Sequence, residues 1–443
     1  MNTTNKEIIP KVRVHALDYE GRGVARIDGK AVFIEGALPG EEVSCRITRS
    51  KKHFDEAETV AVLQASDQRI EPRCPHFSTC GGCVLQHARH EAQVAYKQRV
   101  LEEQLQRIGK VMPEQILPPI YGQPWGYRQR ARLAVAEDST GHLYAGFKAR
   151  KSNRVVKIET CTILPPHISE ILPELQQLLQ GWRKEVAIRS IEISDSDGIS
   201  VLTIVAKSKL DKAQLTALQL FSDRHLNQNH NKWQIWLQIG KQAAQAFYPP
   251  DTEQPYYRLP EFNLSIPYRP GDFTQVNHRV NALMVQRAVR LLDPQPGERI
   301  ADLFCGLGNF TLAIARSGAE VVGIEGSAAQ TEMAAANARL NGLDDNISFH
   351  TADLFQVDST TVASWGKLDK ILLDPPRSGA LEFINALHTP YLPKKIVYVS
   401  CNPATLARDA AEIVKKGYKF KYVGVMNLFP QTAHIESVGC FER

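Results

Sequence analysis

Residues 299–315 read RIADLFCGLGNFTLAIA. A short apolar strand leads into a turn that contains Gly306 and Gly308, and a helical stretch follows the turn. Such a unit lets the backbone approach a nucleotide-like ligand, because glycine places no side chain at the turn. From about residue 270 onward, helical stretches alternate with apolar strands in this way, which predicts an α/β fold with a doubly wound parallel sheet.

Two acidic residues after this turn indicate which ligand binds there. Glu325 ends the next apolar strand, EVVGIEG, where a carboxylate can accept hydrogen bonds from both ribose hydroxyls. Asp353, in ISFHTADLF, is placed to accept from an adenine amino group. The turn itself, residues 305–309, departs from the G-x-G-x-x-G of dinucleotide enzymes. This departure favours S-adenosylmethionine over NAD, and we expect Cys305 to be a small buried side chain.

Two later strand ends point to the reaction. Asp374 follows a strand in KILLDPPRSG, and Arg377 stands where enzymes that methylate exocyclic amines commonly carry an aromatic residue. Cys401 follows the strand of KIVYVSCNP, at the carboxyl end where open α/β sheets hold ligands. A buried inert thiol is one interpretation of Cys401. Its position beside the expected cofactor makes it a candidate nucleophile.

Length and composition indicate a multidomain protein outside the membrane. A chain of 443 residues exceeds one hydrophobic core, and 43% hydrophobic with 23% charged residues is ordinary for globular proteins. The sequence contains no apolar run of about 18 residues, and the N-terminus lacks the apolar core of a signal peptide. We therefore expect a cytoplasmic protein with no membrane partner, whose cysteines form no disulfide partners.

The chain divides into three expected domains. Residues 1–67 alternate short β-type runs with Gly- and Pro-bearing turns, typical of a small closed barrel that binds single-stranded nucleic acid. Residues 68–265 mix helical and strand patterns and form a central domain, although segment 86–120 can instead pack on the catalytic domain. Residues 266–443 contain the α/β pattern and form the catalytic domain.

A basic block in the central domain suggests RNA binding. Residues 126–157 contain eight basic residues and two acidic ones, a net charge of +6. In GYRQRARLAV, the alternating Arg128, Arg130 and Arg132 project from one face of an extended strand, where they can contact successive phosphates. A solvated strand face is the alternative, but nucleic acid explains the one-sided row better.

Clustered cysteines predict a metal site. Cys74, Cys80 and Cys83 have the spacing C-x5-C-x2-C, and Cys161 follows just past the basic block. Four thiolates suit zinc or an iron–sulfur cluster, and the spacing alone does not separate the two. The sequence as a whole favours zinc slightly. A radical S-adenosylmethionine enzyme would need C-x3-C-x2-C and one iron without a cysteine ligand, so this set argues against that class. The site is therefore expected to be structural.

Five motifs in order resemble the RNA uracil-5 methyltransferases: FTQVN (273–277), DLFCGLGNF (302–310), DPPRSG (374–379), VSCNP (399–403) and HIES (434–437). Residues 20–43, EGRGVARIDGKAVFIEGALPGEEV, resemble the TRAM domain, an OB-like barrel attached to RNA-modifying enzymes. Together with the four cysteines, they make the chain similar to the iron–sulfur subclass that modifies 23S ribosomal RNA. The tRNA-specific branch lacks both features.

The resemblance implies a Rossmann-like S-adenosylmethionine methyltransferase domain preceded by the TRAM barrel and a central α+β iron–sulfur domain. It implies that the Cys401 thiolate adds to C6 of a flipped-out uracil and that Glu436 removes the C5 proton. It also reverses the preference at the cysteines from zinc to [4Fe-4S]. The cofactor pocket that it implies consists of Gln275, Phe304, Asn309, Glu325, Asp353 and Asp374.

The partner implied by the resemblance is 23S ribosomal RNA, and the expected state is a monomer. Three alternatives remain open at this point. One is a uracil-5 methyltransferase that acts on tRNA or on another ribosomal RNA. Another is a radical or redox enzyme that uses the cluster. The last is a noncatalytic RNA-binding assembly factor with a degenerate methyltransferase fold, which the presence of both Cys401 and Glu436 disfavours.

Overall fold

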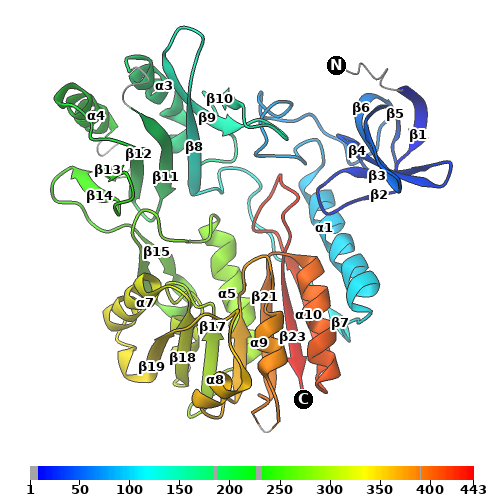
Figure 1. Cartoon of the computed structure of the whole chain (residues 1–443), viewed down its shortest axis with the longest axis vertical. Coiled ribbons are helices and arrows are strands. Elements are labelled where there is room, and N and C mark those ends of the chain that lie inside the picture. Colours follow the sequence, from blue (N-terminus) through cyan, green and yellow to red (C-terminus); the bar gives the residue numbers. More distant parts are fainter. Residues whose placement is uncertain (1–7, 183–186, 226–231, 390) are drawn as a thin grey trace.

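The computed structural model describes residues 8–182, 187–225, 232–389 and 391–443. The first seven residues of the N-terminal stretch analysed above lie outside this part. The described residues form sheets of six, seven and eight strands and a separate two-stranded hairpin. Figure 1 shows the six-stranded and seven-stranded sheets at the top of the molecule and the eight-stranded sheet below them.

The N-terminal sheet is a barrel of short strands with its own core. Its strand order is β1-β5-β6-β4-β3-β2, and β1 also contacts β3, which brings the sheet round on itself. Val32 and Ile34 alternate inward along β4 and are fully buried. The strands are β1 (Ile8–Arg13), β2 (Ala16–Leu17), β3 (Gly23–Ile27), β4 (Lys30–Glu35), β5 (Glu42–Ser50) and β6 (Phe54–Gln64).

The central sheet has the order β10-β9-β8-β11-β12-β13-β14. Its helices α2 (Pro166–Glu170), α3 (Leu172–Gln180) and α4 (Lys212–His225) share one hydrophobic core with the sheet. The apolar run ISVLTIVA forms β12, in which every residue is buried. The strands are β8 (Arg130–Glu137), β9 (Leu143–Lys148), β10 (Val155–Lys157), β11 (Ile188–Asp195), β12 (Ile199–Ala206), β13 (Lys232–Ile239) and β14 (Gln245–Tyr248).

The eight-stranded sheet has the order β19-β18-β17-β20-β21-β23-β22-β7. The strands from β19 to β21 are parallel, and β23 is antiparallel to both β21 and β22. The strands are β17 (Arg299–Leu303), β18 (Glu320–Glu325), β19 (Ile347–Thr351), β20 (Lys370–Leu373), β21 (Lys395–Ser400), β22 (Lys419–Met426) and β23 (Glu436–Glu442). The order reverses between β17 and β20, which is where doubly wound sheets bind ligands.

Helices cover both faces of this sheet. One hydrophobic core contains residues of α8, α9 and α10, and the other contains residues of α5, α6 and α7. This two-sided packing explains why the strands read as continuous apolar runs rather than alternating ones. The helices are α5 (His278–Leu292), α6 (Thr311–Ala315), α7 (Ala328–Leu340), α8 (Ser359–Ser364), α9 (Leu381–Ala386) and α10 (Pro403–Lys415).

Four segments that lie wholly or partly outside residues 266–443 also pack on this sheet. Helix α1 (His90–Gln104) and the π-helical turn η1 (Leu105–Gly109) bury Leu101 and Leu105 in the core beside α10. Gly109 is required there, because an added Cβ would lie 2.3 Å from the carbonyl oxygen of Ala407. Strand β7 (Gln115–Ile116) pairs with β22, and the hairpin of β15 (Tyr256–Leu259) and β16 (Leu264–Pro267) packs in the other core. The hairpin crosses the expected boundary at residue 265.

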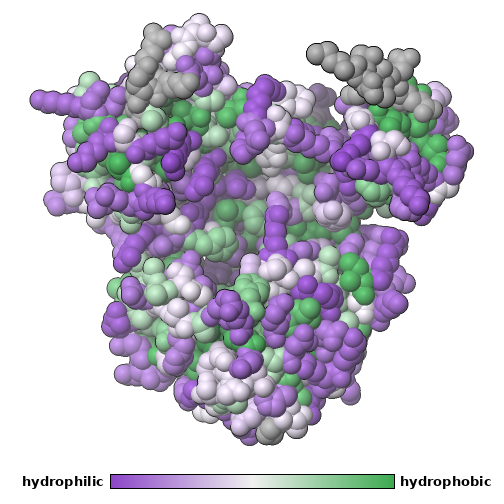
Figure 2. Space-filling view, viewed as in Figure 1, coloured by the Kyte–Doolittle hydropathy of each residue, from purple (hydrophilic) through white to green (hydrophobic). Residues whose placement is uncertain are grey.

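The surface of the described part is mainly hydrophilic over the barrel and the central sheet. Figure 2 shows this face, with a hollow where the upper parts of the molecule meet the eight-stranded sheet below. None of the described helices combines the length and the apolar character needed to cross a bilayer.

Candidate functional site

The turn after β17 has the open backbone that the sequence predicts. Phe304, Gly306 and Gly308 all have positive φ angles, of 63°, 55° and 91°. An added Cβ at Gly306 would meet nothing within 4 Å, so the turn faces open space. The amide of Gly306 donates to Glu325 Oε2 at 3.1 Å, which fixes the turn against the end of β18. A nucleoside can approach this backbone closely.

The predicted cofactor residues lie mainly at one edge of the sheet. Phe304, Glu325, Asp353 and Asp374 follow or end the parallel strands β17, β18, β19 and β20 at their carboxyl ends. The Phe304 ring lies 5.7 Å from the ring of Phe355, which is 40% exposed. These two rings offer an apolar surface beside the two carboxylates.

The other two predicted cofactor residues come from neighbouring segments. Asn309 Oδ1 accepts from Tyr257 Oη and from Asn281 Nδ2, each at 3.0 Å, so its side chain is held by β15 and α5. Gln275 is half-buried in the segment before α5. The structure therefore places Asn309 inside the turn and Gln275 on the approach to α5.

Cys401 and Glu436 stand on neighbouring strands. Ser400 at the end of β21 pairs with Ser437 of β23, so Cys401 and Glu436 are the next residues outward at the same edge of the sheet. Cys401 is half-buried, whereas Glu436 is only 6% exposed. Asp374 lies near enough for its charge to act on both. The two predicted catalytic groups and Asp374 thus form one cluster.

A cavity of about 730 Å³ leads to Cys401. Arg377 and His434 also line it, and Arg377 donates to His434 Nδ1 at 2.9 Å. Tyr19 in the barrel and Gly81, between Cys80 and Cys83, line the cavity as well. Barrel, cysteine segment and catalytic strands therefore all border the space in front of the thiol.

Burial and negative charge dominate the protonation of the catalytic cluster. Burial raises the pKa of Cys401 to about 12, with further increases from Glu436 and Asp374, while Arg377 opposes the shift. Burial raises the pKa of Glu436 well above its usual range, and it raises the pKa of Asp374 to about 7. Without a ligand, burial and the neighbouring carboxylates therefore favour the protonated forms of the thiol and of Glu436.

Sequence reasoning missed Lys97 and Asp302. Lys97 of α1 is 2% exposed, and its charge lowers the pKa of Glu436. Asp302 in β17 is fully buried, and burial raises its pKa to about 7. Asp302 stands within the DLFCGLGNF motif, so a signal existed. Lys97 lies more than 300 residues from Glu436 in the chain, and no local pattern connects them.

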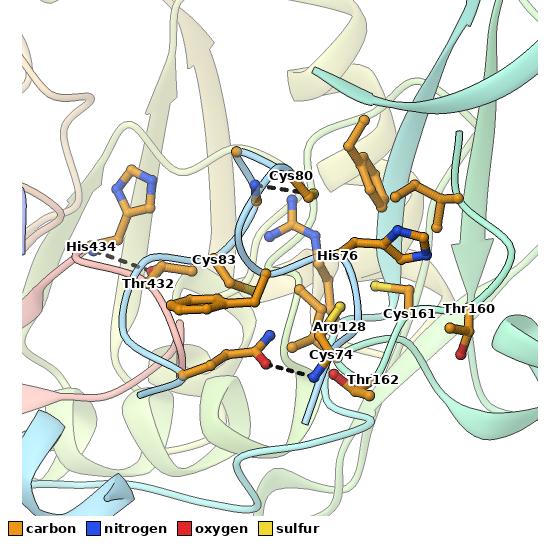
Figure 3. Close-up of a pocket in the computed structure, with 17 residues that line it drawn as sticks. Cys74, His76, Cys80, Cys83, Arg128, Thr160, Cys161, Thr162, Thr432 and His434 are labelled. Carbon is orange, nitrogen blue, oxygen red and sulfur yellow. Dashed lines mark hydrogen bonds between the residues drawn. The ribbon is translucent and has the colours of Figure 1, made fainter. Parts of the chain in front are cut away.

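The four predicted metal ligands line one cavity, of about 250 Å³ (Figure 3). Cys83 and Cys161 are buried, and Cys74 and Cys80 are half-buried. Arg150 ties the cysteine segment together by donating to the carbonyl oxygens of Phe77 and Cys83 at 2.8 and 2.9 Å. Within the described residues, no group of three or more His, Cys, Asp or Glu side chains is placed to hold a metal ion.

The cysteine cavity adjoins the catalytic one. Thr432 and His434 line both cavities, and so do Gly81 and Gly82 of the cysteine segment. Figure 3 shows Thr432 and His434 on the side of the cavity that faces the catalytic strands. The two cavities therefore share part of their lining.

The three arginines of the basic row line a separate cavity of about 290 Å³. Two of them have partners inside the molecule. Arg130 donates to Thr274 Oγ1 at 3.2 Å and to the carbonyl oxygen of Asp272, and Arg132 pairs with Glu192 at 2.5 Å. Arg128 lines both this cavity and the cysteine cavity.

Comparison with known proteins identifies the family of this chain and agrees with its fold. Residues 90–443 match the family model described as tRNA (Uracil-5-)-methyltransferase, and residues 10–60 match the TRAM domain. The chain therefore belongs to the uracil-5 methyltransferase family, a family of enzymes, and carries a TRAM domain near its N-terminus. This confirms the family expected from the five motifs and the barrel expected from the β-type runs.

Individual relatives span almost the whole chain. A protein of Neisseria lactamica named 23S rRNA (uracil(1939)-C(5))-methyltransferase RlmD is 53% identical over 97% of this chain and 94% of its own length. The protein of the same name from Dechloromonas aromatica is 48% identical over 98% and 100%. The crystal structure of Pyrococcus abyssi tRNA (uracil-54, C5)-methyltransferase with S-adenosyl-L-homocysteine has a TM-score of 0.72 at 23% identity, and covers 97% of this chain and 100% of that one. This likeness confirms the fold.

Proposed function

We propose that this chain methylates C5 of a uridine in 23S ribosomal RNA, at the equivalent of the position 1939 that its relatives' names give. The observation that carries the proposal is the pairing of Cys401 and Glu436 on neighbouring strands beside Asp374. The relatives that match over almost the whole chain support the choice of RNA. A tRNA substrate, or another ribosomal RNA, is the second candidate.

The two catalytic residues have separate tasks. C5 of uracil is too weak a nucleophile to take a methyl group unaided. The Cys401 thiolate adds to C6, which makes C5 electron-rich. After methylation, Glu436 takes the C5 proton, and the thiolate is then eliminated. Since the pKa of Cys401 is raised by Glu436 and Asp374 and lowered by Arg377, the Arg377 charge favours the attacking thiolate.

S-adenosylmethionine fits the edge formed by β17 to β20, and when bound it supplies the methyl group. Glu325 is fixed by the Gly306 amide and would accept from the ribose hydroxyls. Asp353 would accept from the adenine amino group, and the Phe304 and Phe355 rings would pack on the apolar part. The remaining residues assigned to this pocket are Gln275, Asn309 and Asp374.

We propose a [4Fe-4S] cluster rather than zinc at the four cysteines, because the family resemblance favours the cluster. Four thiolates around one zinc ion each lie about 2.3 Å from the metal, so they crowd together. In this chain the four thiols line one cavity of about 250 Å³. In a [4Fe-4S] cluster each thiolate binds a different iron, which spreads the ligands apart. We assign the cluster a structural role, with Cys74, Cys80, Cys83 and Cys161 as ligands.

The expected test of the cluster is anaerobic purification. The protein should be brown, with broad visible absorbance that bleaches in air, and Cys161→Ser should lose this absorbance. Cys45→Ser is the matched control, because Cys45 is buried in the barrel core away from the cavity. Stoichiometric zinc without iron in the anaerobic preparation would contradict the assignment.

We place three units in this protein, with modified boundaries. The TRAM barrel ends near residue 67, and the central unit carries the cysteine loop and the seven-stranded sheet. Helix α1, β7 and the β15–β16 hairpin go with the methyltransferase unit, because their apolar side chains lie in its two cores. We further propose that the enzyme acts as a monomer in the cytoplasm, where ribosomal RNA is modified.

One experiment distinguishes methylation of 23S ribosomal RNA from methylation of tRNA, from radical chemistry and from RNA binding without catalysis. The protein is incubated with tritiated-methyl S-adenosylmethionine and either 23S ribosomal RNA or tRNA, with and without dithionite. We expect label at C5 of one uridine in 23S RNA without reductant. Label only in tRNA would favour the second substrate. A requirement for dithionite would indicate radical chemistry, and RNA binding without transfer would indicate a noncatalytic factor.

A further inference from the structure

Lys97 is a lysine buried next to the catalytic cluster. It lies on α1, and it is 2% exposed. Its ammonium donates to Asn427 Oδ1 at 2.7 Å and to the carbonyl oxygen of Phe429 at 2.8 Å. Both acceptors lie just after β22, in the segment 427–435 that leads into Glu436. A buried lysine is costly unless its donors are used, so a site that keeps one needs an explanation.

The face of α1 that carries Lys97 forms several hydrogen bonds with the segment 427–435. Asn427 is fully buried, and its amide donates to His90 Nε2 at 3.0 Å. One helical turn before Lys97, Gln93 donates to Gln431 Oε1 at 2.9 Å and accepts from the Gln431 amide at 2.8 Å. His90, Gln93 and Lys97 follow the spacing of one helix face. Its three residues are polar, and Gln93 and Lys97 are buried while His90 is half-buried, which is unusual for a helix packed on a sheet.

The Glu436 carboxylate, by contrast, accepts no hydrogen bond from the residues that the structure describes. We propose that Lys97 is a positioning residue for the general base, which holds the segment leading into Glu436 and supplies the buried positive charge that favours the Glu436 carboxylate. This inference rests on the proposed function and adds a residue that lies outside all five motifs of the family.

The charges around Glu436 support this role. Burial and Asp374 raise the pKa of Glu436, while Arg377 and Lys97 lower it. Arg377 is exposed and also donates to His434, so Lys97 is the cation shielded from solvent. Burial lowers the pKa of Lys97 to about 7, and Glu436 opposes this shift. The other titratable groups facing the pair are Cys401 from the end of β21, His434 from the same loop and His90 from α1.

Two substitutions separate the hydrogen bonds that Lys97 makes from the positive charge that it carries. Lys97→Gln keeps a donor for Asn427 and Phe429 but removes the charge, whereas Lys97→Met removes both. Arg99→Met is the matched control, because Arg99 is an exposed basic residue on the same helix that pairs with Glu103. Each variant is tested in single turnover with RNA and S-adenosylmethionine over a range of pH. The readouts are the rate of adduct resolution on denaturing gels, the affinity for S-adenosylmethionine and the thermal unfolding temperature.

Without the charge, the pKa of Glu436 rises, so the carboxylate forms only at higher pH. We expect adduct resolution in Lys97→Gln to slow about tenfold near neutral pH for each unit of that shift. The rising limb of its pH profile should move to higher pH, while cofactor affinity stays unchanged. Lys97→Met should be slower still, and Arg99→Met should match the wild type.

Three results would overturn the inference. One is a Lys97→Gln profile that keeps the wild-type pH dependence and is slower at every pH by the same factor, since this shows a structural role only. Another is wild-type resolution in Lys97→Gln. The third is a defect confined to cofactor affinity. If Lys97→Met does not fold, Lys97→Gln still decides the question. A wild-type enzyme that transfers no methyl group would instead contradict the proposed function.

Discussion

Variants of Cys401 and of Glu436 should stop at different steps of the reaction. Addition to C6 and methylation at C5 need the thiolate, whereas release also needs a base for the C5 proton. Glu436→Gln keeps the shape of the side chain and should accumulate a methylated RNA–protein complex that survives denaturing electrophoresis. Cys401→Ala should form no adduct but still bind RNA and cofactor. Labelled RNA and labelled cofactor, run on parallel gels, distinguish these outcomes.

Normal turnover by Glu436→Gln without trapped RNA would mean that another group removes the proton. Asp374 and His434 would then be tested first, since both lie beside Cys401 at the same edge of the sheet. Asp374 has a pKa of about 7, a suitable value for a base at neutral pH.

Asp302 makes stability depend on pH. Its Oδ2 accepts from Thr311 Oγ1 at 2.5 Å, but its buried Oδ1 has no partner among the described residues. Burial raises its pKa from 3.8 to about 7 in the folded state. The folded protein thus binds more protons than the unfolded chain between these values, so the Asp302 contribution to stability falls as pH rises through this window.

Asp302→Asn should therefore gain stability relative to the wild type as pH rises. The change in that difference between about pH 5 and about pH 8 should be on the order of a few kcal/mol, measured by chemical unfolding without cofactor. Comparing the two pH values cancels any constant cost of the altered hydrogen bond to Thr311. A difference that does not change with pH would show that Asp302 is ionised throughout.

Sequence reasoning found the site residues whose position follows from their immediate neighbours in the chain. Cys401 follows an apolar strand, and Glu325 ends one, so the order of residues alone places each at the ligand-binding edge. Glu436 followed from the family resemblance rather than from its surroundings. Lys97 could not be found, because its role depends on a contact between α1 and the segment after β22, which no pattern in either segment records.

Helix α1 should stabilise the methyltransferase unit, although the residues of the central sheet lie between this helix and most of that unit in the sequence. Leu101 is fully buried in the core that also contains Leu406 and Phe383. Leu101→Ala should lower the free energy of unfolding by about 2–5 kcal/mol, through reduced burial and a residual cavity. Ile108→Ala, at a site that is 48% exposed, is the control and should cost much less. A similar loss in both variants would show that α1 contributes little to this core.

The arginine row at the start of β8, with Arg128 just before the strand, should contribute to RNA binding less than three free arginines would. Replacing Arg128, Arg130 and Arg132 together should weaken binding and reduce the salt dependence, by about 0.7–0.9 in slope for each phosphate that the variant no longer neutralises. Because Arg130 is held by Thr274 and the Asp272 carbonyl, we expect the slope to change by the equivalent of at most two phosphates. Filter binding at several salt concentrations measures the slope.

Glu192→Gln provides the opposite test for this strand. It removes the partner of Arg132, so it should strengthen RNA binding and steepen the salt dependence. Cofactor affinity should stay constant in both variants. An unchanged slope in the triple variant would mean that the row is only a solvated face.

Local sequence patterns predicted whether a segment is a helix or a strand better than they predicted which strand or helix it packs against. The β-type runs of the barrel and the run that forms β12 are strands, because alternating or continuous apolar residues specify one buried face or two. Strand β7 has only two residues, both exposed, so it has no periodicity to recognise. Its pairing with β22 depends on the packing of α1, which the sequence allowed but did not decide.

Across the whole molecule, segment 427–435 is contacted by the cysteine segment, by the stretch before β8 and by helix α1. The amides of Val84 and Leu85, just after the last clustered cysteine, both donate to the carbonyl oxygen of Gln431, at 2.9 and 3.0 Å. Tyr127, just before the arginine strand, donates to the carbonyl oxygen of Pro430 at 2.8 Å. With Lys97 and Gln93 on α1, three separate stretches of chain hold the segment that ends at Glu436. Catalysis should therefore respond to the state of the cysteine loop.

Loss of the cysteine site should affect RNA-dependent steps before cofactor binding. The cysteine loop contacts Gln431 and shares Thr432 and His434 with the catalytic cavity, whereas the residues assigned to the cofactor lie mainly at the ends of β17 to β20. In Cys161→Ser we expect weaker RNA binding and slower adduct formation, at unchanged affinity for S-adenosylmethionine by calorimetry. Cys45→Ser, the buried cysteine outside the cavity, should leave RNA binding unchanged. If Cys161→Ser loses cofactor affinity and RNA affinity together, the cysteine site supports the whole fold rather than the loop that carries the base.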